Sequence, residues 1–257
     1  MSAATEMLPI DEPPPLRILG DGVVRVRAAP LGVAVVDDLV TAIVTGEIAP
    51  GDILPAEGLL SQRFAVSRTV IRESVKRVEE KGLVTASQGR GTVINPPSRW
   101  NVLDPHVLSA LVDHDDTLDV LDEIAIVRAS LEATMARAAA ARQSAERNAE
   151  LRAAFERAVP TFHDLTNYNT ADAAFHHVVM EQSGIRLAAN ITRTMFARAR
   201  ESTRFTGNTT EVDAYKSFEE HRAVLEAIVS GDGDMAATTM REHIANAWER
   251  RRSPCDS

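Results

Sequence analysis

Four residues in the C-terminal half of the chain have the types and the spacing of a metal site. Asp172 and His176 are four residues apart in TADAAFHHVV, so they would share one face of a helix. His221 and His243 are each 11 residues from Asp232, which lies in a Gly-Asp-Gly turn. In an antiparallel helical hairpin, equal distance from the turn places two side chains at the same height. Three imidazoles and a carboxylate suit a divalent transition metal, with zinc expected first and nickel or manganese as alternatives.

The segments around these four residues are predicted to be helices. Apolar residues recur at helical spacing, and no convincing strand interrupts them. We therefore expect an antiparallel all-α bundle of six or seven helices over residues 103–252. The predicted helices cover 103–111, 117–141, 144–159, 168–182, 185–204, 215–230 and 234–251. The remaining histidines are expected to be ordinary core or surface residues: His106, His114, His163 and His177.

The composition is that of a globular protein. With 257 residues, 44% of them hydrophobic and 25% charged, the chain is long enough for two domains with a core each. No run reaches the roughly 18 apolar residues of a membrane-spanning helix, and the N-terminus lacks the pattern of a secretion signal, so we expect a cytoplasmic protein with no membrane partner. The single cysteine, Cys255, cannot form an internal disulfide, which fits a reducing compartment and argues against a thiol active site.

Positive charge is concentrated in one short stretch of an acidic chain. The net charge of −9 would by itself argue against a nucleic-acid partner. From Arg63 to Arg90, however, seven positive residues stand against three negative ones. An acidic body that carries one basic element can still dock on phosphate.

This basic stretch is predicted to contain the second helix of a helix-turn-helix. From Val66 to Val78 apolar residues recur at helical spacing, while arginines and lysines occupy the other faces. Ser67 can cap the first turn, and Gly82 can end the helix in the left-handed conformation. A short helix ending near Phe64 precedes it, and the second helix of such a pair enters the DNA major groove. Taken alone, the pattern also fits a solvated surface helix.

The flanking segments complete a small DNA-binding domain. Residues 1–30 are rich in proline and have no regular period, so we expect a mobile arm, and an apolar helical pattern follows it as far as Gly46. After Gly82, two β-prone runs are joined by Gln-Gly-Arg-Gly, which predicts a hairpin with Arg90 at its tip. Consecutive prolines then open a stiff linker over 96–102.

Four motifs occur in order within the domain expected over residues 31–95: PGDILPAE, VSRTVIRE, EEKGLV and GRGTVI. Together they resemble the winged-helix DNA-binding domain of GntR-type bacterial transcription regulators. Gly58 departs from the family pattern, in which a basic residue that contacts DNA is common, and Val70 replaces a common proline. Arginine suits the recognition of bases in DNA because it pairs bidentately with guanine. The DNA-binding residues that the resemblance implies are Arg68, Thr69, Arg72, Lys76, Gly89 and Arg90.

The C-terminal pattern of Asp-x-x-x-His followed by two histidines on the last two helices resembles the FCD effector domain of the FadR subfamily. The resemblance implies a metal and a small carboxylate effector in the bundle, with Arg128 meeting the effector. Without the resemblance, Arg128 fits equally well a surface arginine paired with Glu132 at i+4. The stretch RWNVLDPHVL resembles regulators of sugar-acid catabolism. Galactonate or gluconate is therefore the first effector expected, and lactate-like hydroxy acids come second.

These observations predict a mainly α protein that is a homodimeric repressor of a carboxylate or sugar-acid catabolic operon. Effector binding at the metal site would relieve binding to operator DNA. A dimer is expected because two recognition helices on neighbouring half-sites give operator specificity. Two alternatives stay open: a metal-dependent enzyme that uses the same four residues, which leaves the basic winged helix unexplained, and a regulator whose metal is purely structural.

Overall fold

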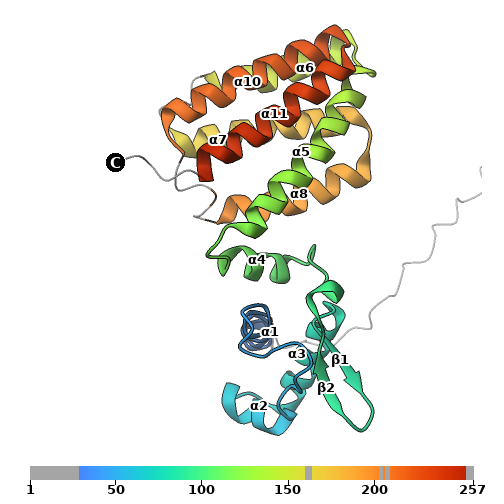
Figure 1. The fold of residues 1–257 in the computed structure, drawn as a ribbon, viewed down its shortest axis with the longest axis vertical. Coiled ribbons are helices and arrows are strands. Elements are labelled where there is room, and N and C mark those ends of the chain that lie inside the picture. Colours follow the sequence, from blue (N-terminus) through green and yellow to red (C-terminus); the bar gives the residue numbers. More distant parts are fainter. Residues whose placement is uncertain (1–28, 160–163, 203–204, 206–208, 253–257) are drawn as a thin grey trace, which may run out of the picture.

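The computed structural model describes residues 29–159, 164–202, 205 and 209–252. The mobile arm predicted over 1–30 lies outside this part of the chain, except for Ala29 and Pro30, which already belong to the first helix. The described residues form a helical bundle at one end and a winged-helix unit at the other, with one helix, α4, between them (Figure 1). The prediction of a mainly α fold is confirmed.

The winged-helix unit contains three helices and a two-stranded hairpin. The predicted ends of its basic helix are confirmed, because Ser67 Oγ accepts a hydrogen bond from the Val70 N–H at 3.3 Å and Gly82 is left-handed with φ of 77°. The two strands pair antiparallel, with Val84 opposite Ile94. The elements are α1 (Ala29–Val44), α2 (Glu57–Phe64), α3 (Arg68–Glu80), β1 (Val84–Ser87) and β2 (Gly91–Ile94).

The bundle is organised around its long central helix, α5. This helix packs against α7, α8, α10 and α11, and alanines on its buried face allow the neighbouring helices to approach closely. The elements are α5 (Asp119–Ala140), α6 (Ala145–Glu156), α7 (Leu165–Ser183), α8 (Arg186–Glu201), α10 (Glu211–Ser230) and α11 (Gly233–Arg252).

Two of these helices begin earlier than the apolar pattern predicts, and polar caps explain the difference. Helix α7 starts after Asp164, whose side chain accepts a hydrogen bond from the Asn167 N–H at 3.1 Å. Helix α10 starts after Thr210, which forms a capping box with Asp213. Capping residues satisfy the free N–H groups of the first turn, so a helix can begin before its first buried side chain.

Helix α4 (Pro105–Asp113) contributes to both hydrophobic cores. Val107 and Ala110 pack into the core of the winged-helix unit, whereas Leu108 and Val112 pack into the bundle. The predicted linker before it contains the short 3-10 helix η1 (Pro97–Arg99). The winged-helix unit is therefore joined to the bundle through a shared helix.

Polar contacts also hold the segment that leads into α4. The Trp100 Nε1–H donates to the carbonyl oxygen of Asn95 at 3.1 Å, and Lys81 Nζ lies 2.8 Å from Asp104 Oδ2. A side chain at Gly82 would collide with the backbone of Arg99, so the chain passes close to the end of α3 here. Among the described residues, no helix is long and apolar enough to cross a membrane.

Candidate functional site

The structure brings the four predicted ligand residues together inside the bundle. Helix α7 provides Asp172 and His176, α10 provides His221 and α11 provides His243. The three Nε2 atoms form a triangle with sides of 2.9, 3.2 and 3.2 Å, and Asp172 Oδ1 lies 3.7 Å from Nε2 of His221. All four side chains are buried, and their nearest ligand atoms lie within 4.8 Å of one another.

The hairpin between α10 and α11 sets the height of two of these imidazoles, as the spacing around Asp232 predicts. Gly231 ends α10 in the left-handed conformation with φ of 78°, and α11 begins at Gly233. The two helices then run side by side (Figure 1). His221 and His243 therefore meet at the same level of the bundle, with Nε2 atoms 2.9 Å apart.

Two glutamates that the motif does not include hold the outer ring nitrogens of two histidines. Glu132 Oε2 lies 2.6 Å from Nδ1 of His176, and Glu220 Oε2 lies 2.9 Å from Nδ1 of His243. Burial alone would raise the pKa of Glu132, but the charges of Arg128 and His176 and their hydrogen bonds outweigh it and hold the pKa at about 2. At Glu220 the effect of burial is likewise outweighed, by hydrogen bonds from Arg250 and His243, and the pKa is about 2.

The protonation of these groups suits a metal. Both glutamates are ionised at neutral pH, so Nδ1 of His176 and of His243 carries the proton and donates it to the carboxylate. Burial, followed by the neighbouring imidazoles, lowers the pKa of His221, and burial is also the largest cause of the lowered pKa of His243. Neutral imidazoles of this tautomer present the lone pair of Nε2, which is the form that binds a metal.

The geometry also fits a cation. Two lone pairs that face each other at 3.2 Å, as in His176 and His243, repel unless a positive charge lies between them. A metal about 2.0 to 2.1 Å from each nitrogen would hold neighbouring nitrogens roughly 3.0 to 3.4 Å apart. The observed separations of 2.9 to 3.2 Å are close to that range. The residues present therefore fit a divalent transition metal.

Arg128 lies beside this cluster and is buried, which overturns the surface alternative. Its Nε atom donates to Glu132 Oε1 at 2.8 Å, so the i+4 pair does form, but with only 6% and 1% of the two side chains exposed. Its guanidinium carbon lies 3.5 Å from the ring centroid of Phe196. Among the described residues, neither terminal Nη atom of Arg128 has a hydrogen-bond partner. A buried guanidinium with a free edge is suited to binding an anion.

A second arginine that the sequence analysis did not identify lies near the cluster. The guanidinium of Arg251 is 4.8 Å from the ring centroid of Phe205 and close enough to Asp172 and Arg128 for their charges to act on it. Burial lowers the pKa of Arg251, and the charge of Asp172 acts in the opposite direction. Its distance of 79 residues along the chain from Asp172 leaves no local pattern that could have indicated this proximity.

The residues implied in DNA binding are all exposed on the winged-helix unit. Four of them lie on α3, three at positions i, i+4 and i+8, so they share one face of the helix. The remaining two lie in the turn between β1 and β2, where Gly89 has φ of 80°. The six exposed residues are Arg68, Thr69, Arg72, Lys76, Gly89 and Arg90.

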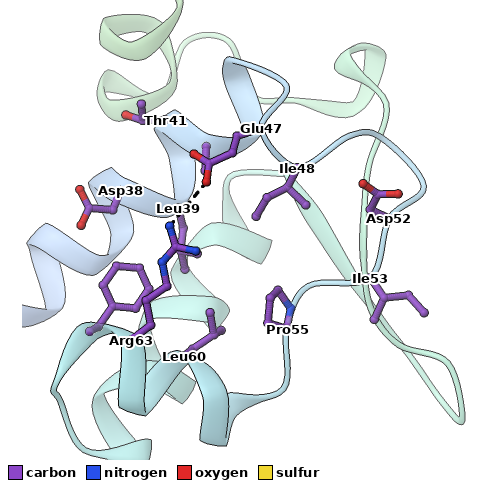
Figure 2. A pocket seen from close by; sticks show the side chains of 12 residues that line it. Asp38, Leu39, Thr41, Glu47, Ile48, Asp52, Ile53, Pro55, Leu60 and Arg63 are labelled. Atoms are coloured by element: carbon purple, nitrogen blue, oxygen red, sulfur yellow. Dashed lines mark hydrogen bonds and ion pairs between the residues drawn. The ribbon is translucent and has the colours of Figure 1, made fainter.

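A hollow of about 810 Å³ opens on the winged-helix unit and is lined by residues between Asp38 and Phe64 (Figure 2). It lies between α1, α2 and the turn that carries Asp52, and its side chains come from both helices. Arg63 and Glu47 face each other across it at 3.5 Å, with 73% and 61% of their side chains exposed. Because its polar groups are solvated, this hollow lacks the buried, converging groups that make the histidine cluster a candidate site.

Comparison with known proteins follows the two parts of the fold. Residues 31–94 match the model for bacterial regulatory proteins of the gntR family, and residues 123–246 match the FCD domain. The uncharacterized HTH-type transcriptional regulator YieP of Escherichia coli (strain K12) is 32% identical over 211 residues, which cover 80% of this chain and 89% of that protein. The chain belongs to the GntR family of bacterial regulators, with a C-terminal FCD domain.

Two further proteins are similar to this GntR-family regulator. The galactonate operon transcriptional repressor of Escherichia coli (strain K12) is 29% identical over 208 residues, covering 81% of this chain and 91% of that protein. A solved structure described as "Lar controls the expression of the Listeria monocytogenes agr system and mediates virulence" has a TM-score of 0.53 at 20% identity, covers 86% of this chain and 96% of that one, and supports the fold. Because the family and these relatives are transcription regulators, the enzyme alternative is excluded.

Proposed function

We propose that this GntR-family regulator is a homodimeric repressor of a sugar-acid or related carboxylate catabolic operon, released from its operator when a carboxylate binds beside a metal in the bundle. The observation that carries the proposal is the convergence of three imidazoles and Asp172 next to the free edge of Arg128. The site lies in the FCD domain, and the winged-helix unit presents a separate basic face.

The four proposed metal ligands are Asp172, His176, His221 and His243. Zinc is the metal expected first, with nickel or manganese as alternatives, because imidazole and carboxylate ligands suit all three. When bound, the ion would act as a Lewis acid that accepts an oxygen of the effector. The protein's own contribution is to aim the imidazoles at one point through the two glutamates, while burial lowers the pKa of His221 and of His243.

The charges around the site favour an anionic effector. Four carboxylates, those of Asp172, Glu132, Glu220 and Asp213, lie among three guanidinium groups, so the cluster has one excess negative charge without an ion. A divalent cation would leave an excess of positive charge in a buried site. The free edge of Arg128 could then take one carboxylate oxygen while the metal takes another. The galactonate repressor among the relatives, and RWNVLDPHVL, support a sugar acid as the first candidate.

Operator binding is assigned to the exposed face of α3 and to the wing. Arg68 and Arg72 would reach guanine edges or adjacent phosphates, and Lys76 lies further along the same exposed face. Arg90 would contact the phosphate backbone from the turn of the hairpin.

Exposed apolar side chains on the bundle support the homodimer. Ile126 is 67% exposed and Val127 is 40% exposed on α5, and Leu187 is 73% exposed on α8, a helix that packs against α5. Val127 also lines an apolar groove of about 270 Å³ together with Trp100 and residues of α4. Apolar surface of this kind is characteristic of protein interfaces, and we assign it to a second copy of the chain because two recognition helices are needed for two half-sites.

A regulator with a purely structural metal is the second candidate. Complete burial favours it, since His176, His221 and His243 are 1%, 1% and 3% exposed. Calorimetry with galactonate, gluconate and lactate on metal-loaded and metal-stripped protein separates the two candidates. Binding that requires the metal supports effector capture at the site, whereas equal binding to both forms removes the metal from that role.

Operator binding is tested by gel shift with DNA from the promoter of the protein's own gene, against excess unrelated DNA. The proposal expects a complex that survives the competitor at physiological salt, because specific binding is typically about 10³ to 10⁷ times tighter than non-specific binding. Native mass spectrometry of the same sample would report the dimer and the retained metal. A monomer, or complete loss of the complex to unrelated DNA, would contradict the proposal.

A further inference from the structure

The two glutamates that hold the histidines are themselves held by arginines. On the buried side, Arg128 Nε donates to Glu132 Oε1 at 2.8 Å, and Glu132 Oε2 accepts from His176 at 2.6 Å. On the other side, Arg250 donates from Nη1 and Nη2 to the two oxygens of Glu220, both at 2.8 Å, and Glu220 accepts from His243 at 2.9 Å. The site therefore contains two Arg–Glu–His chains of contacts.

We infer that Arg250 and Glu220 are positioning residues for His243, and that they form an outer counterpart to the inner chain of Arg128, Glu132 and His176. The inference rests on the proposed metal site, for which His243 is a ligand. Arg250 lies beyond residues 123–246, the range that matches the FCD domain.

The outer chain determines which nitrogen of His243 carries a proton. Nδ1 lies 2.9 Å from Glu220 Oε2, and both Glu220 oxygens already accept hydrogen bonds from Arg250, so Nδ1 is the donor and Nε2 keeps its lone pair toward His176 and His221. The bidentate pair with Arg250 fixes the plane of the carboxylate, and so the orientation of the imidazole. Ligands held in this way bind a metal without first reorganising.

Contacts from three other residues hold Arg250 and Glu220 in place. Nη2 of Arg250 also donates to Ser217 Oγ at 2.8 Å, and its Nε lies 4.0 Å from Asp213 Oδ1. Asn246 Nδ2 donates to Glu220 Oε1 at 3.2 Å. Because Asp213 belongs to the capping box of α10, the outer chain also ties the start of α10 to the end of α11.

The third imidazole has no such support. Among the described residues, the carboxylate nearest to His221 is that of Asp172, which lies 3.7 Å from Nε2 and not at Nδ1. The Nε2 atom of His221 can therefore carry the proton in the metal-free protein and donate it to one of the other two imidazoles. The two glutamates thus favour the Nδ1–H tautomer at His176 and His243, and no carboxylate selects a tautomer in this way at His221.

The outer chain can be tested because it is partly exposed. Of the Glu220 side chain 22% is exposed, compared with 1% for Glu132, so water can solvate Arg250 when Glu220 is removed. The test variant is Glu220→Ala. Its matched control is Glu219→Ala, which removes the same side chain one position earlier, where it pairs with Arg222 at 3.0 Å on the surface. Glu220→Gln retains the shape and an acceptor oxygen without the charge.

The first measurement is the tautomer of His243 in metal-stripped full-length protein, from the nitrogen chemical shifts of ¹⁵N-labelled imidazoles. We expect the Nδ1–H form in the wild type and in Glu219→Ala, and conversion toward the Nε2–H form in Glu220→Ala. The second measurement is zinc affinity by competition with a chelator. Glu220→Ala should bind zinc about 10 to 100 times more weakly than the wild type, Glu220→Gln should lose less, and Glu219→Ala should be unchanged.

An unchanged tautomer in Glu220→Ala would overturn the inference, as would an equal loss of zinc affinity in Glu219→Ala. A wild type that binds no zinc would instead contradict the proposed metal site, because the tautomers of the metal-free protein still decide whether Glu220 positions His243. If Glu220→Ala does not fold, the same two readouts on Glu220→Gln decide, with full wild-type zinc affinity as the contrary result.

Discussion

The Nε2 atoms of His221 and His243 lie 2.9 Å apart, although the two residues are 22 positions apart in the sequence and belong to different helices. This contact could not form if the hairpin between α10 and α11 were one residue longer on one side, because a one-residue shift rotates a helical side chain by about 100°. The length of the turn therefore determines whether the two ligands meet.

Removing the metal should destabilise the protein. An ion present at 100 times its Kd adds about 2.7 kcal/mol to the stability of the folded state, because the unfolded chain lacks the assembled site. For a chain of this size we expect chelation to lower the Tm by on the order of 5 to 10 °C. Calorimetry with and without chelator measures this shift. In His243→Ala the Tm should be the same with and without chelator. A wild-type Tm that does not change on chelation would contradict a bound metal.

Separate alanine substitutions of Arg72 and Lys76 should distinguish base recognition from phosphate binding. Arg72→Ala should cost roughly 1 to 3 kcal/mol on the operator and relax the preference at one base position. Lys76→Ala should weaken binding to all sequences and reduce the salt slope by about one. The control is Arg77→Ala, which removes the same charge from an exposed position about 140° around α3 from Arg72 and about 100° from Lys76. Fluorescence anisotropy over a salt series checks these effects, and equal losses in all three variants would argue against α3 as the reading helix.

Asp104 should contribute stability that is lost in acid. Burial acts to raise its pKa, but Lys81 and two backbone N–H groups outweigh this and lower the pKa. A group with a lowered folded pKa stabilises the protein above its unfolded pKa, and the contribution is lost as the pH falls through the folded value. Asp104→Asn retains the cap of α4 and removes the charge, so it should cost up to about 1 kcal/mol at pH 7.

Urea unfolding of wild type and Asp104→Asn between pH 7 and pH 3 tests this account. The difference in the free energy of unfolding should shrink below about pH 4, where the free aspartate also becomes protonated. A difference that stays constant over the whole range would show that the charge of Asp104 is not the cause.

Thr192 should be a site where a small change stabilises the metal-free protein. Its side chain is fully buried in α8, and Oγ1 has no hydrogen-bond partner among the described residues. Thr192→Val has nearly the same shape and removes an unsatisfied hydroxyl, so we expect a gain of about 1 kcal/mol in thermal or urea unfolding. Thr194→Val is the control, since its hydroxyl donates to the Asn190 carbonyl at 3.0 Å. A loss of stability at Thr192 would show that its hydroxyl is bonded.

Periodicity and turn residues were sufficient to predict most of the fold. Apolar spacing identified each helix of the bundle, and Gly231 with Gly233 marked the hairpin that aligns two ligands. Periodicity could not show that α4 packs into two cores, because an apolar face carries no information about which neighbour covers it. Periodicity also misplaced the starts of α7 and α10. These helices begin after the capping residues Asp164 and Thr210, and caps act through polar groups that lie outside the apolar pattern.

The candidate site was predicted only where its residues lie on one helix or on either side of one turn. Glu132 could be predicted as the i+4 partner of Arg128, but Glu132 and His176, which are in contact, are 44 residues apart in the sequence. Glu220 and His243 are 23 residues apart, and Glu220 and Arg250 are 30 apart. Contacts of this kind depend on how the helices pack, which no local spacing specifies.

The most direct test of a regulator controlled through its metal site is operator affinity measured by anisotropy while galactonate, gluconate or lactate is titrated. Metal-loaded wild type should lose operator affinity with at least one of these acids, and by linkage the acid should bind more weakly to the DNA complex. His243→Ala should bind the operator without responding to the same acid. An operator affinity that is unchanged by all three acids, or an equal response in His243→Ala, would contradict the account.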